Sequence, residues 1–130
     1  MLFRSPHIIQ VLDHGEVDGS LFIATQLVTG ADLARRLEDG PLPVGTALTL
    51  AVQISAGVAD AHRAGVLHRD IKPSNVVLHW NGSAEVVKVI DFGLAKLVSD
   101  RPADSDLLTL TGFVVGTPAY MAPERLSGGE

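Results

Sequence analysis

The side chains best suited to chemistry lie together in one short stretch, His68 to Asn75, which reads HRDIKPSN. It contains a carboxylate at Asp70, an ammonium group at Lys72, a rigid proline at Pro73 and a carboxamide at Asn75. Carboxylate and carboxamide oxygens are ligands that hard cations such as Mg²⁺ prefer. The stretch therefore combines an acid, a cation and a candidate metal ligand within a few residues.

The segment that follows predicts a β-hairpin that brings in a second oxygen ligand. Residues 76–78 read as a strand, Asn81-Gly82 as a turn, and residues 86–90 as the return strand, with Trp80 partly buried between them. Asp91 follows the return strand directly, in the tripeptide Asp91-Phe92-Gly93. Because Asn75 precedes the first strand and Asp91 follows the second, we expect these two oxygen ligands to meet at one spot.

The residues upstream predict a second hairpin and a short helix. Apolar runs at 8–12 and 21–28 lie on either side of an Asp18-Gly19 turn signal, so we expect two paired strands. Asp32 is expected to cap a short helix that carries Leu33, Ala34 and Leu37 on one face and ends at residues 39–40.

A long helix is expected from Pro43 or Val44 to Ala64, where apolar residues recur at spacings of three and four. Its apolar surface is wider than one stripe, so we expect it to lie deep within a domain. Residues 40–59 carry no charge, but prolines, glycines and polar residues interrupt them, and we interpret the segment as a buried helix rather than a membrane span. Residues 109–130 show little periodicity and predict irregular structure.

The composition of the chain limits the classes of protein and partner. The chain has 130 residues, enough for one modest domain, and its apolar content of 46% is that of a globular protein. A net charge of −5 argues against nucleic acid as a partner, because nucleic-acid-binding domains usually carry a basic surface. The absence of cysteine excludes disulfides and thiolate metal sites.

Three motifs in the chain resemble those of the protein kinase family, in the same order. HRDIKPSN is similar to the catalytic loop pattern H-R-D-L-x-x-x-N, the tripeptide at 91–93 matches D-F-G, and residues 116–124, GTPAYMAPE, resemble the segment that ends in A-P-E. The resemblance implies an α+β fold, protein kinase-like, present as a partial domain: an N-lobe strand pair, a hinge, and a helical C-lobe portion with the catalytic-loop β-hairpin. Residues 1–28 would form the end of the N-lobe and the hinge, and residues 29–130 the first part of the C-lobe.

The resemblance also implies roles at the catalytic centre. Asp70 would orient the substrate hydroxyl and accept its proton, Lys72 would contact the transferred phosphate of ATP, and Asn75 and Asp91 would hold Mg²⁺. Thr117 matches the threonine that hydrogen-bonds near the catalytic Asp and Lys in serine/threonine kinases. In addition, His68 would support the loop and Phe92 would pack beneath the site.

Further roles lie at the hinge and in the segment between the second and third motifs. Thr25 would be the gatekeeper residue, with Gln26 to Val28 facing adenine through backbone groups. Thr109 and Thr111 resemble the phosphorylation sites of bacterial serine/threonine kinases, where a phosphate could pair with Arg69.

The resemblance therefore implies a serine/threonine protein kinase that uses ATP and Mg²⁺, takes protein Ser/Thr hydroxyls as acceptors and has a cytoplasmic kinase domain, although a full-length protein could be membrane-anchored. The sequence contains no G-x-G-x-x-G loop and no strand lysine in a V-A-I-K-like setting. We interpret this as truncation and expect the fragment to be inactive and only marginally stable alone. The alternatives are a non-catalytic kinase-like binding module and a small-molecule phosphotransferase, but Lys72 and the 117–124 segment favour protein kinases over the latter.

Overall fold

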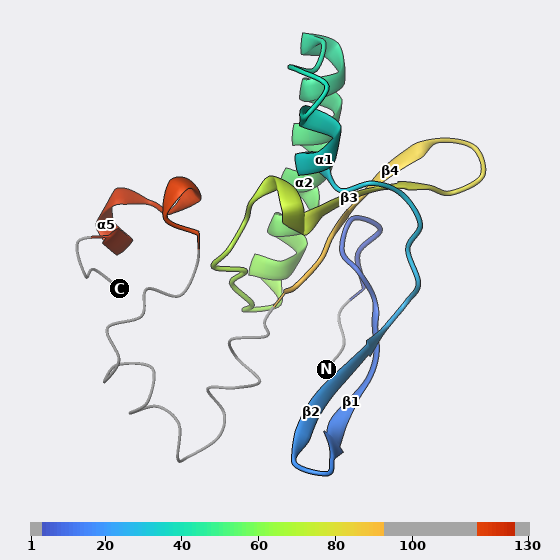
Figure 1. Cartoon of the computed structure of the whole chain (residues 1–130), viewed down its shortest axis with the longest axis vertical. Coiled ribbons are helices and arrows are strands. Elements are labelled where there is room, and N and C mark those ends of the chain that lie inside the picture. Colours follow the sequence, from blue (N-terminus) through green and yellow to red (C-terminus); the bar gives the residue numbers. More distant parts are fainter. Residues whose placement is uncertain (1–3, 93–116, 127–130) are drawn as a thin grey trace.

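The computed structural model describes residues 4–92 and 117–126 of the chain. Its described elements follow the order β1 Val11–Val17, β2 Ser20–Thr25, α1 Leu33–Leu37, α2 Val44–Arg63, a 3₁₀ turn Pro73–Asn75, β3 Val76–Trp80, β4 Glu85–Val89, a second 3₁₀ turn Pro118–Tyr120 and α5 Pro123–Leu126. The β1–β2 hairpin occupies one end of the long axis and the two longer helices the other, with the β3–β4 hairpin between them (Figure 1).

The first hairpin forms at the expected turn, but its first strand is displaced along the sequence. Val17 pairs with Ser20, and Asp18 and Gly19 both have positive φ, 50° and 77°, as a type I′ turn requires. The strand expected at residues 8–12 instead runs from Val11 to Val17 and includes polar residues. These are accommodated because β1 is mostly exposed, so pairing with β2 rather than burial determines its extent. Likewise, β2 ends at Thr25, not at residue 28.

The β3–β4 hairpin is confirmed, and neighbouring segments extend it on both sides. Ile8, expected to start the first strand, instead forms a parallel bridge with Val89, and Val89 N–H donates to the His7 carbonyl at 2.8 Å. On the opposite edge, Leu78 N–H donates to the Ala31 carbonyl at 2.9 Å. The hairpin that leads out of the catalytic-looking loop is therefore held along both of its edges.

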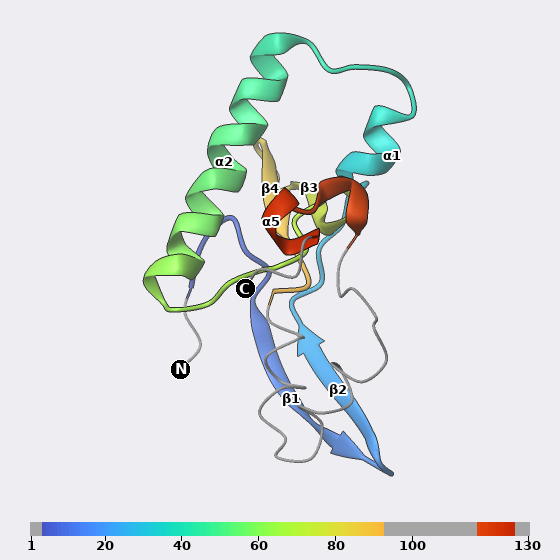
Figure 2. The same cartoon turned by 90° about the vertical axis from the view of Figure 1, so that its left-hand side faces the viewer.

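Helix α1 begins where its cap residue predicts. The Asp32 carboxylate accepts a hydrogen bond from the Arg35 N–H at 2.9 Å, which satisfies a backbone donor of the first turn. Helix α2 packs against β4, and its Gln53 side chain accepts a hydrogen bond from the Val87 N–H at 2.9 Å. Figure 2 shows α2 running alongside the β3–β4 hairpin.

The core lies between α2 and the β3–β4 hairpin. Its buried cluster consists of one helix residue and four strand residues: Leu50, Val76, Leu78, Val87 and Val89. Partly buried apolar side chains surround this cluster, and they include Ile71 from the loop and Phe92. The loop 68–75 and Asp91 are thus attached to the most tightly packed part of the described chain.

The expectation that α2 lies deep within a domain is wrong for the described chain. Only Leu50, Gly57 and Ala61 of this helix are buried, whereas Leu48 and Val52 are 62% and 69% exposed. One side of the helix covers the hairpin, and its wide apolar surface leaves a second side uncovered. Among the described residues, α2 is also the one helix long and apolar enough to span a membrane by length and composition.

Two smaller expectations also differ from the structure. Trp80 is 60% exposed rather than partly buried, because it lies at the outer end of β3, away from the core cluster. The region expected to be irregular contains the 3₁₀ turn Pro118–Tyr120 and the short helix α5. Both begin at a proline, whose fixed φ suits the first residue of a helical turn.

Candidate active site

His68 anchors the start of the loop. It is 6% exposed, its Nε2 lies 2.8 Å from the Ile90 carbonyl oxygen, and its Nδ1 accepts a hydrogen bond from the Asp70 N–H at 3.2 Å. These partners require the tautomer with hydrogen on Nε2, which donates to Ile90. The imidazole also packs edge-on against the Phe92 ring, with 4.4 Å between ring centroids. His68 thus connects the loop to the residues that surround Asp91.

Asp70 is held by three side chains or backbone groups around its carboxylate. Its Oδ1 accepts from the Thr117 N–H at 3.1 Å, and its Oδ2 lies 2.9 Å from Lys72 Nζ and 3.4 Å from Asn75 Nδ2. Lys72 Nζ also donates to Thr117 Oγ1 at 2.8 Å. The three residues expected to be catalytic, Asp70, Lys72 and Thr117, therefore form one closed hydrogen-bonded group across 47 residues of sequence.

The electrostatic setting of Asp70 favours its ionised form. The hydrogen bond from Lys72 is the largest influence that lowers its pKa below the usual 3.8, and the Thr117 backbone N–H acts in the same direction. Partial burial opposes this shift by penalising the charged carboxylate. The net effect is a lowered pKa, so the carboxylate is available as a hydrogen-bond acceptor at neutral pH.

Asn75 lies at the base of the β3–β4 hairpin beside the strand that leads to Asp91. The Ile90 N–H donates to the Asn75 carbonyl at 2.9 Å, so Asp91 is the next residue after a backbone hydrogen bond to Asn75. The Asn75 side-chain NH₂ donates to the Asp70 carbonyl at 2.9 Å. This fixes the amide orientation, and its Oδ1 has no hydrogen bond among residues 4–92 and 117–126. The hairpin arrangement expected from the sequence is confirmed at the level of the backbone.

Two residues of this region adopt a backbone conformation that side chains other than glycine rarely take. Arg69 has φ 67° and Asp91 has φ 62°. Each such conformation costs on the order of 1 kcal/mol and persists only where surrounding contacts enforce it. Here they flank the two ends of the His68–Ile90 hydrogen bond. Strain of this kind concentrates at functional sites, and no pattern in the sequence indicated it.

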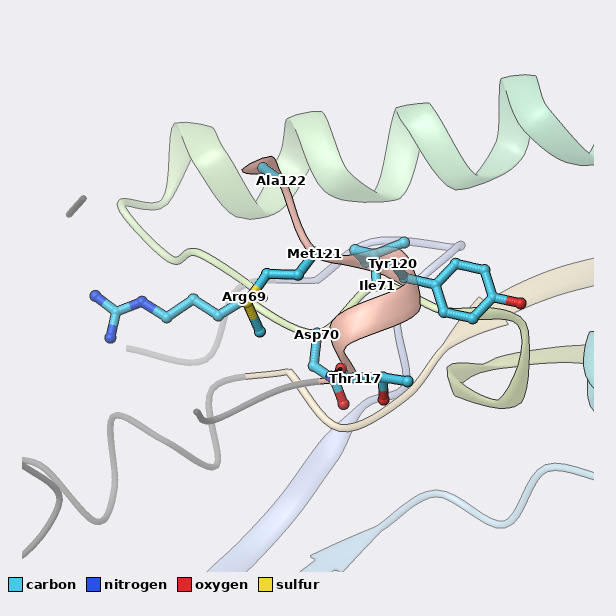
Figure 3. Close-up of a pocket in the computed structure, with 7 residues that line it drawn as sticks. All are labelled: Arg69, Asp70, Ile71, Thr117, Tyr120, Met121 and Ala122. Atoms are coloured by element: carbon cyan, nitrogen blue, oxygen red, sulfur yellow. Dashed lines mark hydrogen bonds between the residues drawn. The ribbon is translucent and has the colours of Figure 1, made fainter. Parts of the chain in front are cut away.

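A pocket of about 200 Å³ opens beside Asp70. Its lining combines the loop with the 117–122 segment: Arg69, Asp70, Ile71, Thr117, Tyr120, Met121 and Ala122. In Figure 3 the oxygens of Asp70 and Thr117 point to the same side, whereas the Arg69 side chain extends away from them. No role at the pocket was expected for Ile71, Met121 or Ala122, and only the folded chain brings Met121 and Ala122 beside the carboxylate.

The residues expected at the hinge follow β2. Gln26 N–H donates to the Gln10 carbonyl at 2.9 Å, and Gln26 Oε1 accepts from the Gln10 N–H at 2.9 Å. Thr25 is the last residue of β2 and is exposed, whereas Val28 is partly buried. Within the described residues, neither the Gln26 carbonyl nor the Val28 N–H makes a hydrogen bond. The structure does not bring these hinge residues into the hydrogen-bonded group around Asp70.

Several expectations lie outside the described residues. These are the roles of Thr109 and Thr111 as phosphorylation sites and of Gly93 in the D-F-G motif. Arg69, their expected partner, is exposed and lines the pocket beside Asp70.

Comparison with protein families and curated proteins gives a consistent result. A family model described as "Protein kinase domain" matches residues 1–130. The serine/threonine-protein kinase pkn3 of Myxococcus xanthus is 44% identical over 128 residues, which is 96% of this chain and 23% of that protein. The serine/threonine-protein kinase PknH of Mycobacterium bovis is 41% identical over 98% of this chain and 20% of its own length. The chain thus spans about a fifth of the length of these relatives.

Solved structures give the same result for the fold. The kinase domain of Mycobacterium tuberculosis PknI, in a C20A_R136A double mutant, is 33% identical with a TM-score of 0.70, over 98% of this chain and 43% of that one. A second crystal structure of this domain is 42% identical with a TM-score of 0.63, over 70% of this chain and 37% of that one.

Proposed function

Since this chain belongs to the protein kinase family, we propose that it supplies the catalytic loop and acceptor site of a serine/threonine protein kinase, which transfers the γ-phosphate of ATP to protein hydroxyls. In this proposal, residues 1–28 are the end of the N-lobe and the hinge, and residues 29–130 are the first part of the C-lobe. The observation that carries the proposal is the closed group of Asp70, Lys72 and Thr117.

The bonds around Asp70 support a role in placing the acceptor hydroxyl. Thr117 bonds to Oδ1, and Lys72 and Asn75 bond to Oδ2, which fixes the plane of the carboxylate and leaves a lone pair on Oδ1 for a substrate O–H. The lowered pKa makes Asp70 a weak base in the resting state. Its main contribution is therefore to orient the hydroxyl, and it takes the proton as the oxygen loses it during transfer.

Lys72 supports the proposal through its position between two acceptors. Its ammonium group contacts both the Asp70 carboxylate and the Thr117 hydroxyl, so it is held beside the oxygen that would attack. A cation there would neutralise negative charge on a transferred phosphoryl group. Thr117 holds Lys72 with its hydroxyl and Asp70 with its backbone N–H, and so couples the two.

The residues expected to hold Mg²⁺ fit a hard cation. Asn75 offers an amide oxygen whose orientation is fixed by its NH₂ bond to Asp70, and Asp91 offers an exposed carboxylate one residue beyond the Asn75–Ile90 bond. Oxygen donors of this kind suit Mg²⁺, which when bound would neutralise charge on the phosphates of ATP. Asn75 and Asp91 would hold the ion, and at the hinge the Gln26 carbonyl and the Val28 N–H would hold adenine beside Thr25.

The pocket beside Asp70 supports a protein side chain as acceptor. It is open, has a volume of about 200 Å³, and has apolar walls from Ile71, Met121 and Ala122. A serine or threonine side chain could enter it with its hydroxyl directed at Asp70. A cytoplasmic location of the kinase domain and regulation by phosphate at Thr109 or Thr111, paired with Arg69, belong to the same proposal.

The test is an Asp70→Asn substitution in a kinase domain that carries this sequence. Phosphate transfer to a protein substrate should fall by about 100-fold or more, since the carboxylate that receives the proton is removed. Asp60→Asn is the matched control, because Asp60 pairs with Arg63 on α2 and makes no bond to the group of Asp70, Lys72 and Thr117. Full turnover by Asp70→Asn, or product labelled on tyrosine only, would contradict the proposal.

A further inference from the structure

A second, smaller cavity lies away from the Asp70 pocket. It has a volume of about 90 Å³ and lies where the N-terminal segment, the end of β2 and β4 meet. Its lining residues are Arg4, Ser5, Ile8, Ile9, Gln10, Gln26 and Lys88. None of them lines the pocket beside Asp70, so the two cavities are separate sites.

Lys88 reaches this cavity because of the alternation of side chains along β4. Its neighbours Val87 and Val89 are fully buried in the core, so the Lys88 side chain points to the other face of the hairpin. There it meets residues 8–10, which the hydrogen bond from Ile9 N–H to the Val89 carbonyl holds at 2.9 Å. Lys88 is partly buried, and burial lowers the pKa of its ammonium group. Within the described residues its ammonium group has no ion pair or hydrogen bond, although its backbone pairs with Val77 of β3.

Three other polar side chains of the cavity, those of Gln26, Ser5 and Arg4, also present donors. Gln26 uses its Oε1 to accept from the Gln10 N–H, which leaves its NH₂ group without a partner in the described residues. Ser5 Oγ accepts from the His7 N–H at 3.3 Å, so its hydroxyl hydrogen remains to be donated. Arg4 adds an exposed guanidinium group at the edge. Among the described residues, none of those that line the cavity carries a carboxylate.

A partly buried cation beside several donors, with no carboxylate among the residues that line the cavity, lacks a charged partner. We propose that this cavity is a binding site for a small oxyanion, a phosphate group or a carboxylate, held by Lys88 and the Gln26 amide with Arg4 and Ser5 at the rim. Bonds from charged donors to such an anion are stronger than bonds between neutral groups. The donor set also disfavours a cation or a purely apolar ligand, because either would leave Lys88 without an acceptor.

Because of where the cavity lies, a bound anion would connect two elements of the fold. Gln26 follows directly after β2, and Lys88 lies three residues before Asp91 on β4. An anion held by both would connect the end of the first hairpin to the strand that leads to Asp91. Its binding is measurable without any kinase activity, so the result does not depend on the proposed function.

The experiment is a titration of the full chain with inorganic phosphate and, separately, with acetate, at constant ionic strength set with chloride. The readout is the backbone amide NMR shifts of Ile9, Gln26 and Lys88. Saturable shifts at these amides are expected. Saturation with phosphate alone identifies a phosphate site, and saturation with acetate as well identifies a site that a carboxylate also fills. Lack of saturation with both anions overturns the proposal.

Two variants and one control locate the site. Lys88→Gln should weaken binding by about tenfold or more, because it removes the charged donor. Gln26→Glu keeps the acceptor for Gln10 N–H but places a carboxylate beside Lys88, so it should abolish binding while the shifts of α2 amides stay unchanged. Arg36→Gln removes the same charge from the exposed face of α1 and should bind as the unmodified chain does. Equal binding by all three variants would indicate an adventitious ion only and overturns the assignment.

Discussion

The Lys72 ammonium group contacts both the Asp70 carboxylate and the Thr117 hydroxyl, and these two contacts connect distant parts of the chain. The bond to Asp70 lies within the loop, whereas the bond to Thr117 crosses 45 residues. Both partners are partly exposed, so solvent weakens each bond, but together they restrict the ammonium group to one place. The position of the 117–122 segment is therefore linked to the protonation and identity of side chains in the loop.

Substitutions at Thr117 test the role of its hydroxyl separately from the role of its backbone N–H. Thr117→Val keeps the shape and the N–H that Asp70 accepts, but it removes the acceptor for Lys72. In a kinase domain that carries this sequence, we expect phosphate transfer to fall about tenfold or more, as is typical when a hydrogen bond to a charged group is lost. Thr117→Ser keeps the hydroxyl and should retain most of the activity. Equal rates for the valine and serine variants would show that the hydroxyl is not needed.

The lowered pKa of Asp70 predicts a specific pH dependence of stability. Because the folded pKa lies below the usual 3.8, the folded state binds the proton less readily than the unfolded state. The stabilisation is fully present above the unfolded pKa and is lost as pH falls through the folded value. Urea unfolding of the chain and of Asp70→Asn at a series of pH values should therefore show a difference that shrinks below pH 3.8. A difference independent of pH would contradict the shift.

At the level of secondary-structure elements, the end of the first hairpin is joined to β3 by a close backbone contact. Gly30 has φ 139°, and a Cβ at this position would overlap the Leu78 carbonyl oxygen. Next to it, His79 Nδ1 lies 3.2 Å from the Thr29 N and 3.0 Å from its carbonyl oxygen. The segment between β2 and α1 is thus fixed against the same strand that begins after Asn75.

Two glycine substitutions test this contact. Gly30→Ala requires the backbone of β3 to move and places a side chain at an unfavourable φ, so we expect a loss of roughly 2–4 kcal/mol of unfolding free energy. Gly45→Ala, near the start of α2, meets open space and should stabilise the chain by about 0.5–1 kcal/mol. Thermal or urea unfolding measures both. Similar effects at the two positions would mean that the Gly30 contact is not formed.

At the scale of the whole molecule, the described chain has one core and a long helix that covers it with only one side. Leu50 is 4% exposed and belongs to the core cluster, whereas Leu48, two residues earlier, is 62% exposed. Uncovered apolar surface of this kind contributes nothing to the stability of the isolated chain and favours association. Stability should therefore depend strongly on which side of α2 a residue occupies.

Two leucine substitutions on α2 make this dependence measurable. Leu50→Ala removes a side chain from the core and should cost about 2–5 kcal/mol of unfolding free energy. Leu48→Ala removes the same atoms from an exposed position and should change stability by less than about 0.5 kcal/mol. If Leu48→Ala destabilised the chain as much as Leu50→Ala does, α2 would have to be covered on both sides in solution.

Local signals in the sequence predicted the hairpin turns and the α1 cap, because the Asp18-Gly19 turn and the Asp32 cap act over a few residues. The motif residues Asp70, Lys72 and Thr117 were also expected together, through the family resemblance. The positive φ of Arg69 and the apolar side of the pocket at Met121 were not predicted, since both arise only when distant segments pack. Apolar spacing likewise could not tell which side of α2 would be covered.

The bond between the Ile90 N–H and the Asn75 carbonyl closes the base of the β3–β4 hairpin, and it has a practical consequence at the other end. The tip, at Asn81 to Ala84, is exposed and held by its own hydrogen bonds to Asn81 Oδ1. Because the base is fixed independently of the tip, a label at the tip should not disturb Asn75 or Asp91. The chain contains no cysteine, so Ser83→Cys would give a single attachment point for a fluorophore on the hairpin that carries both candidate metal ligands.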